Sequence, residues 1–206
     1  DQGGCTCSRC APWGANGFLR MAEPIARRFR AAFPRGKVIL STWYFDHFTH
    51  GEWEGLAEAF AHRPDWVDYL MADDYGDRFP DYPIRRGAPG NLPMVGFPEI
   101  SMYQCNPWGG YGANPFPAHL QSLWDQAKDH LAGGFPYSEG IYEDINKAVC
   151  AQFYWDKQTP ARDTVREYIA FEYSPEVVDD VMAAIDVLEH NLPRSYQPDI
   201  DGGRCD

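Results

Sequence analysis

Basic residues are scarce in this chain, and their scarcity limits the partners it can have. Its 206 residues contain 18 Lys and Arg against 30 Asp and Glu, which gives a net charge of −12. Such a surface repels phosphate backbones and anionic lipid headgroups, so we expect neither nucleic acid nor a membrane as a partner. The sequence also has no apolar run near the ~18 residues that a membrane-spanning helix needs.

Two further landmarks are missing. The chain begins at Asp1 without a Met and without the basic and apolar segments of an export signal, so we expect a processed or excised piece, and any export signal could lie upstream. We therefore expect a soluble protein that is secreted or periplasmic rather than cytoplasmic. No Gly-x-Gly-x-x-Gly turn follows an expected strand, which gives a dinucleotide site little support.

Short apolar segments alternate with amphipathic helical segments along the chain. The expected strands are 37–46, 66–74, 92–102 and 134–140, and the expected helices are 18–33, 51–62, 117–132, 142–155, 160–172 and 175–190. The Pro- and Gly-rich stretches 76–91 and 103–116 are expected to be loops. This alternation is typical of parallel strands joined by right-handed crossovers.

Four strand–helix units match half of an eight-stranded barrel, which typically needs ~250 residues. We predict an α/β fold: a partial (half) TIM barrel over residues 1–190 with extra C-terminal helices, followed by an extended tail at 191–206. A doubly wound open sheet is the alternative. Because a half-barrel leaves two sheet edges open, we expect either a homodimer or a missing N-terminal barrel half to cover them.

Each expected strand carries a carboxylate at or near its end. These are Asp46, the pair Asp73 and Asp74, Glu99 and Glu139. In parallel α/β folds the site lies at the carboxyl ends of the strands. Glycoside hydrolysis needs two carboxyl groups, ~5 Å apart for retention and ~6.5–9.5 Å apart for inversion. Since neighbouring strands lie ~4.8 Å apart, we predict that Glu99 and Glu139 are the acid/base and the nucleophile, in no assigned order.

The aromatic residues are numerous and often lie in loops rich in Gly and Pro. The chain has 7 Trp, 12 Tyr and 12 Phe, and Trp43, Trp108 and Tyr137 lie near the expected strand ends. We predict that these three rings stack on sugars, while Asp46 and the Asp73–Asp74 pair bind hydroxyls or tune the catalytic carboxyls. The alternative for the rings is packing over the core.

Several of these acids have a structural alternative. Glu139, Glu143 and Asp144 precede or open an expected helix, where the helix dipole favours a negative charge. The Asp73–Asp74 pair could simply start a loop, or could bind a metal.

Three cysteines lie within six residues, at Cys5, Cys7 and Cys10. Thiolates at this spacing are typical of a structural zinc site, and Cys105 is a candidate fourth ligand because it lies just beyond an expected strand. Disulfides or free thiols are the alternative, and the even total of 6 Cys permits them. The cysteines therefore do not decide the compartment.

Four segments together suggest a family. They are the stretch 1–14 with its C-x-C-x2-C spacing, Ser41-Thr42-Trp43-Tyr44-Phe45-Asp46, Asn106-Pro107-Trp108-Gly109-Gly110, and the stretch 137–146, which reads Tyr-Ser-Glu-Gly-Ile-x2-Asp-Ile-Asn. As a set they resemble the C-terminal part of barrel domains in bacterial glycoside-hydrolase-like proteins, in the style of alpha-glucuronidase and hexosaminidase barrels. The resemblance covers most of residues 1–173 and implies a (β/α) barrel with acidic catalytic groups at strand ends. In such barrels an acid/base often ends the fourth strand, a place that Asp1 would mark here.

The leading prediction is a glycoside hydrolase that acts on a plant or microbial polysaccharide. One alternative is a barrel remnant that binds carbohydrate without turnover. Another is a metal-dependent carbohydrate-active enzyme, which could be oxidative, in which His47, His50 and nearby acids surround a metal.

Overall fold

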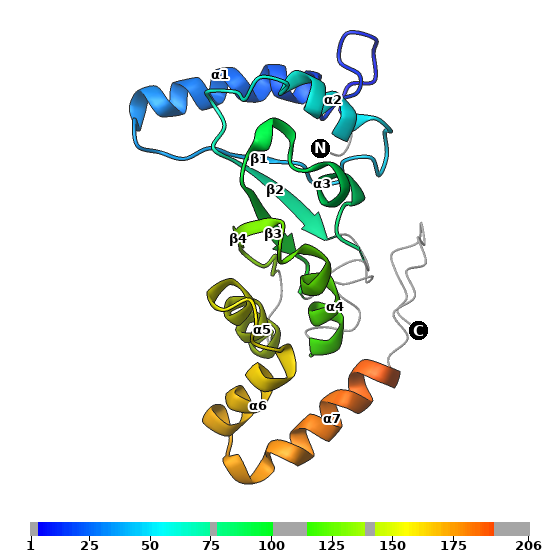
Figure 1. Ribbon diagram of the computed structural model, residues 1–206, viewed down its shortest axis with the longest axis vertical. Coiled ribbons are helices and arrows are strands. Elements are labelled where there is room, and N and C mark those ends of the chain that lie inside the picture. Colours follow the sequence, from blue (N-terminus) through cyan, green and yellow to red (C-terminus); the bar gives the residue numbers. More distant parts are fainter. Residues whose placement is uncertain (1–3, 75–77, 101–114, 139–142, 192–206) are drawn as a thin grey trace. The chain divides into compact units, whose positions relative to one another are not determined.

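The computed structural model describes residues 4–74, 78–100, 115–138 and 143–191, with the side chains of Asp73, Asp74 and Asn191 left out. The protein is a mixed α/β protein with a four-stranded parallel sheet in the order β1-β2-β3-β4 (Figure 1). The chain divides into two compact units, and each is described by itself. Unit 1 comprises 1–73, 79–96 and 129–133, and unit 2 comprises 74–78, 97–128 and 134–206.

The elements alternate along the chain much as the sequence predicts. The first group is α1 (Gly17–Ala32), β1 (Ile39–Ser41), α2 (Glu52–Ala59), β2 (Tyr69–Asp74), α3 (Asp81–Arg86), the 3-10 helix η1 (Pro89–Asn91) and β3 (Met94–Pro98). The second group is α4 (Pro117–Ala127), β4 (Leu131–Gly134), α5 (Asp144–Trp155), α6 (Ala161–Glu172), the 3-10 helix η2 (Pro175–Val177) and α7 (Val178–Asn191).

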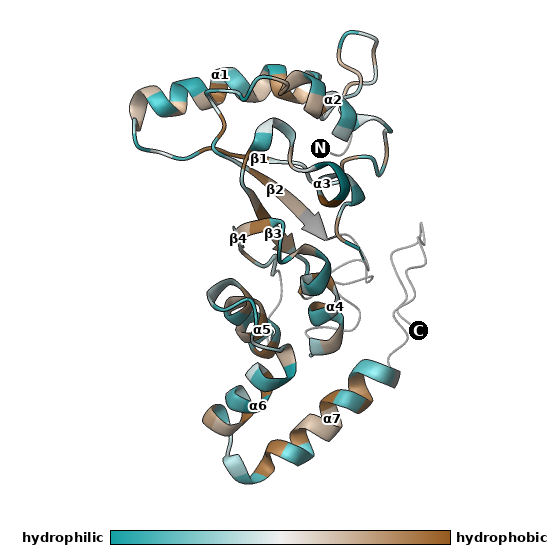
Figure 2. Ribbon diagram, viewed as in Figure 1, coloured by the Kyte–Doolittle hydropathy of each residue, from teal (hydrophilic) through white to brown (hydrophobic). Residues whose placement is uncertain are grey.

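The strands of unit 1 contribute central residues to its core. Leu40 of β1 pairs in register with Leu70 of β2, and the Leu70 N–H donates a hydrogen bond to the carbonyl of Pro93, the residue before Met94. Leu40, Leu70 and Met94 are all buried, and Figure 2 shows the hydrophobic character of β2 and β3. Met71 and Ala72 of β2 are buried as well, so β2 is covered on both faces.

Unit 2 is a helical layer built around stacked aromatic rings. The rings of Trp124 in α4 and Phe153 in α5 stack with centroids 5.1 Å apart, and Tyr154 packs edge-on against Trp124 at 5.4 Å. Tyr154 also lies over Gly134 of β4, where an added Cβ would come within 2.3 Å of its ring. A glycine at that position lets α5 approach the strand closely.

Several predicted elements differ from those of the structure, most clearly in three places. The expected strand 37–46 shortens to β1, because Tyr44 and Asp46 adopt left-handed φ angles of 62° that end the extended backbone. The expected helix 117–132 ends at Ala127, and its last residues instead begin β4, ahead of the predicted strand 134–140. The expected loop 76–91 contains α3 and η1.

None of the described helices has the length and hydrophobicity needed to cross a lipid bilayer. The expected tail 191–206 lies, from residue 192 on, outside the described residues.

Candidate functional site

A carboxylate and an aromatic ring meet at the strand ends of unit 2. Glu99, one residue after β3, forms a parallel β-bridge with Tyr137, three residues after β4. The Tyr137 N–H donates to the carbonyl of Pro98 at 2.8 Å, and the Ile100 N–H donates to the carbonyl of Tyr137 at 3.1 Å. These hydrogen bonds fix Glu99 and Tyr137 side by side just beyond the carboxyl ends of β3 and β4.

The two faces of this strand end differ in burial. Along β3 the odd-numbered residues Val95 and Phe97 are half-buried and the even-numbered ones are buried, and the alternation continues into half-buried Glu99 and buried Ile100. Rings crowd the half-buried face, because Phe97 lies 5.3 Å from Tyr137 and 5.2 Å from Phe135 between centroids. Glu99 therefore shares a partly open face with three aromatic rings.

A second carboxylate, Glu143, is buried at the start of α5. It accepts a hydrogen bond from the Ser138 hydroxyl, and its Oε2 lies 3.7 Å from Nζ of Lys147. Its backbone carbonyl also accepts the Lys147 N–H, which places Glu143 at the N-terminal end of the helix. The sequence indicates Glu143 as a helix-start acid, and the structure adds its burial and its hydrogen bond from Ser138.

In unit 1, four rings gather after β1. Trp43 stacks on Tyr44 at 5.5 Å, Tyr44 stacks on Phe48 at 5.5 Å, and His47 packs edge-on against Phe48 at 4.4 Å. Trp43 is half-buried and Phe48 is exposed, so the cluster has an accessible side. An accessible aromatic surface of this kind suits the stacking of a sugar ring.

The predicted hydroxyl ligand Asp46 is used in local structure. Its Oδ1 accepts the backbone N–H of Glu52 at 2.7 Å, and Oε2 of the buried Glu52 accepts the Asp46 N–H at 3.1 Å. Oε1 of Glu52 accepts the N–H of Gly14 at 2.7 Å. Asp46 thus anchors the first turn of α2, which is the role of an N-terminal capping acid.

Several predicted site residues lie beyond what the structure describes. Asp73 and Asp74 end β2, and only their backbone is described. Glu139, Trp108 and Cys105 lie outside the described residues. The predicted pair of Glu99 and Glu139 is therefore placed at one member only.

Cys5, Cys7 and Cys10 form a second cluster, with their sulfur atoms within 4.8 Å of one another. The Cys5 and Cys10 thiols and the Arg9 backbone hydrogen bond to Cys7, the Cys5 thiol most strongly, and lower the pKa of Cys7 to about 7. Hydrogen bonding to Cys7 raises the pKa of Cys10. Three sulfurs at this spacing can bind one soft metal ion. Among the described residues no other group of three or more ligands, His47 and His50 included, has this arrangement.

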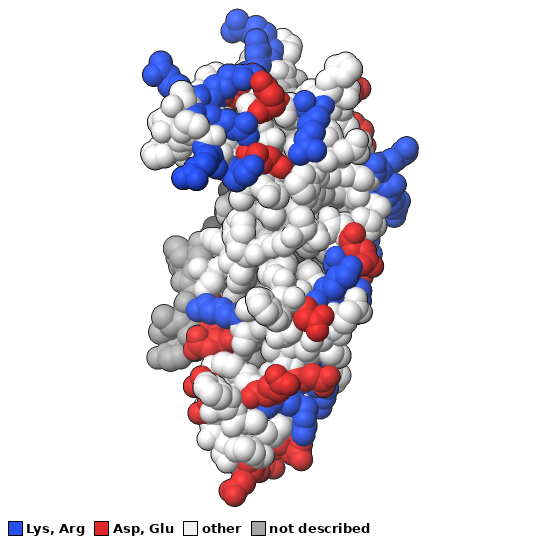
Figure 3. Space-filling view, turned by 60° about the vertical axis from the view of Figure 1, so that its left-hand side comes forward, with Lys and Arg blue, Asp and Glu red and all other residues white. Residues whose placement is uncertain are grey.

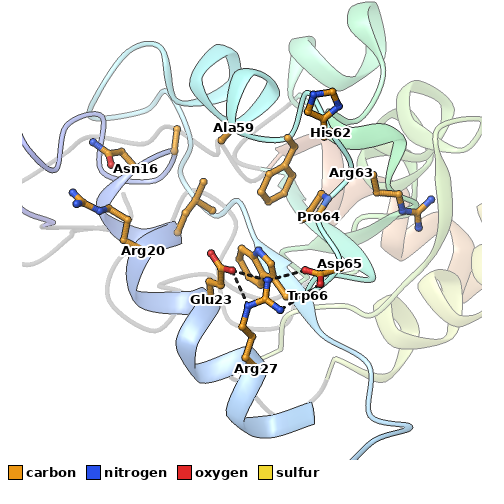
Figure 4. Close-up of a pocket in the computed structure, with 13 residues that line it drawn as sticks. Asn16, Arg20, Glu23, Arg27, Ala59, His62, Arg63, Pro64, Asp65 and Trp66 are labelled. Atoms are coloured by element: carbon orange, nitrogen blue, oxygen red, sulfur yellow. Dashed lines mark hydrogen bonds and ion pairs between the residues drawn. The ribbon is translucent and has the colours of Figure 1, made fainter. Parts of the chain in front are cut away.

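A pocket of about 500 Å³ lies between α1 and the segment after α2 (Figure 4). Its two carboxylates are both occupied by Arg27, which lies 2.8 Å from Oε1 of Glu23 and 2.8 Å from Oδ1 of Asp65. Figure 4 places Arg20 and Arg63 on opposite sides of the pocket, so they do not converge on one point. The pocket therefore has no pair of carboxyl groups suited to acid–base chemistry.

A search of protein-family models, of curated proteins and of solved structures finds no match to this chain. The fold and its clusters define an α/β protein with a parallel sheet, an acid among aromatic rings at the strand ends, and a group of three cysteines near the N-terminus.

Proposed function

We propose that this protein is a glycoside hydrolase built on half of a (β/α) barrel, with Glu99 as one of its two catalytic carboxyl groups. The observation that carries the proposal is the bridge between Glu99 and Tyr137, with Phe97 and Phe135 on the same face. Aromatic faces bind the apolar faces of sugar rings, and a carboxyl beside them is positioned for a glycosidic oxygen or anomeric carbon.

The order of the strands favours a barrel-type sheet. The order β1-β2-β3-β4 follows the chain without reversal, whereas a doubly wound sheet reverses its order at a switch point. In a barrel the strand ends converge on one rim, and the helices cover the outer face. The half-buried face of β3 that carries Phe97 and Glu99 would then be the inner one.

The chemistry needs a second carboxyl group at ~5 Å or at ~6.5–9.5 Å from the first. Glu139, two residues after Tyr137, is the proposed partner of Glu99. Glu143 accepts a hydrogen bond from Ser138 and lies near Lys147, and these contacts favour a structural role for it at the start of α5.

The test is the release of reducing sugar from a panel of plant and microbial polysaccharides. We expect Glu99→Gln and Glu139→Gln each to lower turnover by about 10²–10⁴-fold, the usual range for a positioned acid or base. Glu58→Gln, an exposed change on α2, is the matched control and should leave turnover unchanged. Full activity in Glu99→Gln would remove Glu99 from the mechanism.

The same panel separates catalysis from binding alone. If the protein is a carbohydrate-binding remnant, it will be retained by a polysaccharide without releasing sugar. In that case Phe135→Ala, which removes an exposed ring beside Phe97, should weaken retention while Glu99→Gln should not.

A second function is supported by a separate observation. Because the sulfur atoms of Cys5, Cys7 and Cys10 lie within 4.8 Å of one another, we propose that they hold a structural zinc ion. The pKa of Cys7, lowered to about 7, makes its thiolate accessible at neutral pH. Three thiolates suit a site that braces the chain more than one that keeps a position open for a substrate.

Metal content per chain decides this proposal. We expect about one zinc per chain after purification without chelator, and a loss of zinc in Cys7→Ser. Cys150→Ala is the control, because Cys150 is buried in α5 outside the cluster. Equal zinc content in Cys7→Ser and the unmodified protein would contradict the site.

A further inference from the structure

Helix α1 exposes a continuous apolar face. Its members recur every fourth residue, the first three along one side of the helix and the last, Phe33, at its C-cap. They are Met21, Ile25, Phe29 and Phe33, exposed by 49%, 62%, 38% and 60%. The rings of Phe29 and Phe33 lie 5.3 Å apart, so the face ends in a joined aromatic pair. A contiguous exposed apolar surface of this kind is characteristic of an interaction site.

This face is bordered by positive charge in an otherwise acidic protein. Residues 20–37 contain six Lys and Arg and a single acid, Glu23. Arg28, three positions after Ile25, and Arg35 are exposed and take part in none of the ion pairs among the described residues. Figure 3 shows Lys and Arg side chains gathered over α1.

The turn between α6 and α7 is acidic and exposes aromatic rings, and its charge is opposite to that around the apolar face of α1. We call residues 167–180 the acidic tip; they contain five Asp and Glu and no Lys or Arg. Two aromatic side chains project from it, Phe171 with 86% and Tyr173 with 64% of the side chain exposed. Glu172, Glu176 and Asp180 are exposed around them, and Figure 3 shows acidic side chains gathered over α6 and α7.

We propose that the apolar face of α1 binds the acidic tip of a second copy of this chain. Phe171 and Tyr173 would pack on Ile25 and Phe29, and the acids of the tip would meet Arg28 and Arg35. Both surfaces lose exposed apolar area in such a contact, and each charge set is offset by its opposite.

The two surfaces are different parts of the molecule, so the contact is head-to-tail. A head-to-tail contact that does not close into a ring leaves one free surface at each end of the assembly, and the assembly can grow. Growth of this kind separates the proposal from a symmetric dimer, which stops at two copies.

Sedimentation of the full chain over a range of protein and salt concentrations provides the test. We expect the average mass of the assembly to rise steadily with protein concentration. At a fixed protein concentration, raising the salt should lower this average mass by at least the mass of one subunit. Salt screens the exposed charges on both surfaces.

Variants of each surface sharpen the test. Ile25→Asp disables the α1 face and Phe171→Asp disables the tip, so each variant alone should remain a monomer. An equimolar mixture of the two still holds one intact face and one intact tip, and it should form a one-to-one heterodimer that grows no further. Arg28→Glu, an exposed change that leaves packing intact, should weaken assembly of the otherwise unmodified chain about tenfold or more. Trp155→Asp, an equally exposed aromatic position (88%) outside both surfaces, is the control and should assemble normally.

Four outcomes would overturn the proposal. The first is an unmodified chain that stays monomeric at every concentration, which is expected if another protein or the chain itself covers α1. The second is a dimer that does not grow, and the third is a mixture of Ile25→Asp and Phe171→Asp that fails to pair. The fourth is an effect of Trp155→Asp on assembly as large as that of Phe171→Asp.

Discussion

The Nδ2 of Asn146 donates a hydrogen bond of 2.9 Å to the backbone carbonyl of Ile100. Asn146 lies in the first turn of α5 and is fully buried, and Ile100 directly follows Glu99. The Oδ1 of the same side chain accepts the N–H of Phe116, the residue before α4. One amide therefore joins the end of β3 to two helices and helps to hold Glu99 in place.

Replacing this amide should loosen unit 2. In Asn146→Ala the carbonyl of Ile100 and the N–H of Phe116 both lose their partner, at a cost of about 1–3 kcal/mol for each buried group left unsatisfied. Asn146→Asp keeps an acceptor for Phe116 but cannot donate to Ile100 when ionised, so it should be destabilised at neutral pH and recover partly in acid. Urea unfolding followed by tryptophan fluorescence measures both variants, and unchanged stability in Asn146→Ala would contradict the role.

Glu52 should contribute to the stability of unit 1 in a similar way. The buried carboxylate accepts the N–H groups of Gly14 and Asp46. Glu52→Ala leaves both donors without a partner, so we expect a loss of about 2–6 kcal/mol from two unsatisfied groups. Glu54→Ala removes an exposed acid from the same helix and should change the free energy of unfolding by less than about 0.5 kcal/mol. Circular dichroism during urea unfolding distinguishes the two.

The pH dependence of stability should depend on Asp68. Burial raises the pKa of this carboxyl, but hydrogen bonds from the Val38 N–H, Lys37 and Arg30 outweigh burial and hold the pKa below its usual value. A carboxyl with a lowered folded pKa stabilises the fold above its unfolded pKa, ~3.9 for Asp. This contribution is lost as the pH falls through the lower, folded pKa.

Asp68→Asn should therefore destabilise the protein by about 1–3 kcal/mol at neutral pH, and the difference should shrink in strong acid. Asp186→Asn is the matched control. Asp186 binds Arg162 through two hydrogen bonds, of 2.8 Å and 3.0 Å, but both side chains are about half exposed, so its loss should cost no more than about 1 kcal/mol. Equal effects of the two changes at neutral pH would show that the partners of Asp68 add nothing.

The local sequence predicts the helices better than any other part of the fold. The expected helix 160–172 is α6, Ala161–Glu172, which begins directly after Pro160. The expected helix 142–155 is α5, Asp144–Trp155. Both have apolar residues at helical spacing, and a proline or an acid marks the first turn, so the information lies within the helix itself.

The ends of the strands depend on distant partners and were harder to predict. The apolar run after Ser41 has the composition of a strand, yet Tyr44 and Asp46 turn left-handed because Asp46 exchanges hydrogen bonds with Glu52 on the next helix. Glu143 has the sequence signature of a helix-start acid, and its burial follows from the position of Ser138, across a loop. Local pattern contains neither contact.

The thiols near the N-terminus should differ in reactivity once metal is removed. The pKa of Cys7 is lowered to about 7 by hydrogen bonds, of which the one from Cys5 is the largest cause, whereas the pKa of Cys10 is raised. Because the thiolate is the nucleophile, iodoacetamide in the presence of EDTA should alkylate Cys7 before Cys10, and the rate at Cys7 should level off above about pH 7. Cys150 is buried and should react last. Mass spectrometry of the digested protein measures each site.

Two replacements of Cys5 isolate the cause of this reactivity. Cys5→Ser keeps a hydroxyl that can donate to the Cys7 sulfur, so the rate at Cys7 should still level off near neutral pH. Cys5→Ala removes the donor, and the same profile should move toward the ordinary thiol pKa of ~8.5. Added zinc should protect all three cysteines in the unmodified protein if they share one ion, since a bound thiolate is no longer free to attack. Identical pH profiles for Cys5→Ser and Cys5→Ala would show that the hydrogen bond from Cys5 does not set the reactivity of Cys7, and protection of only one cysteine by zinc would contradict a shared metal site.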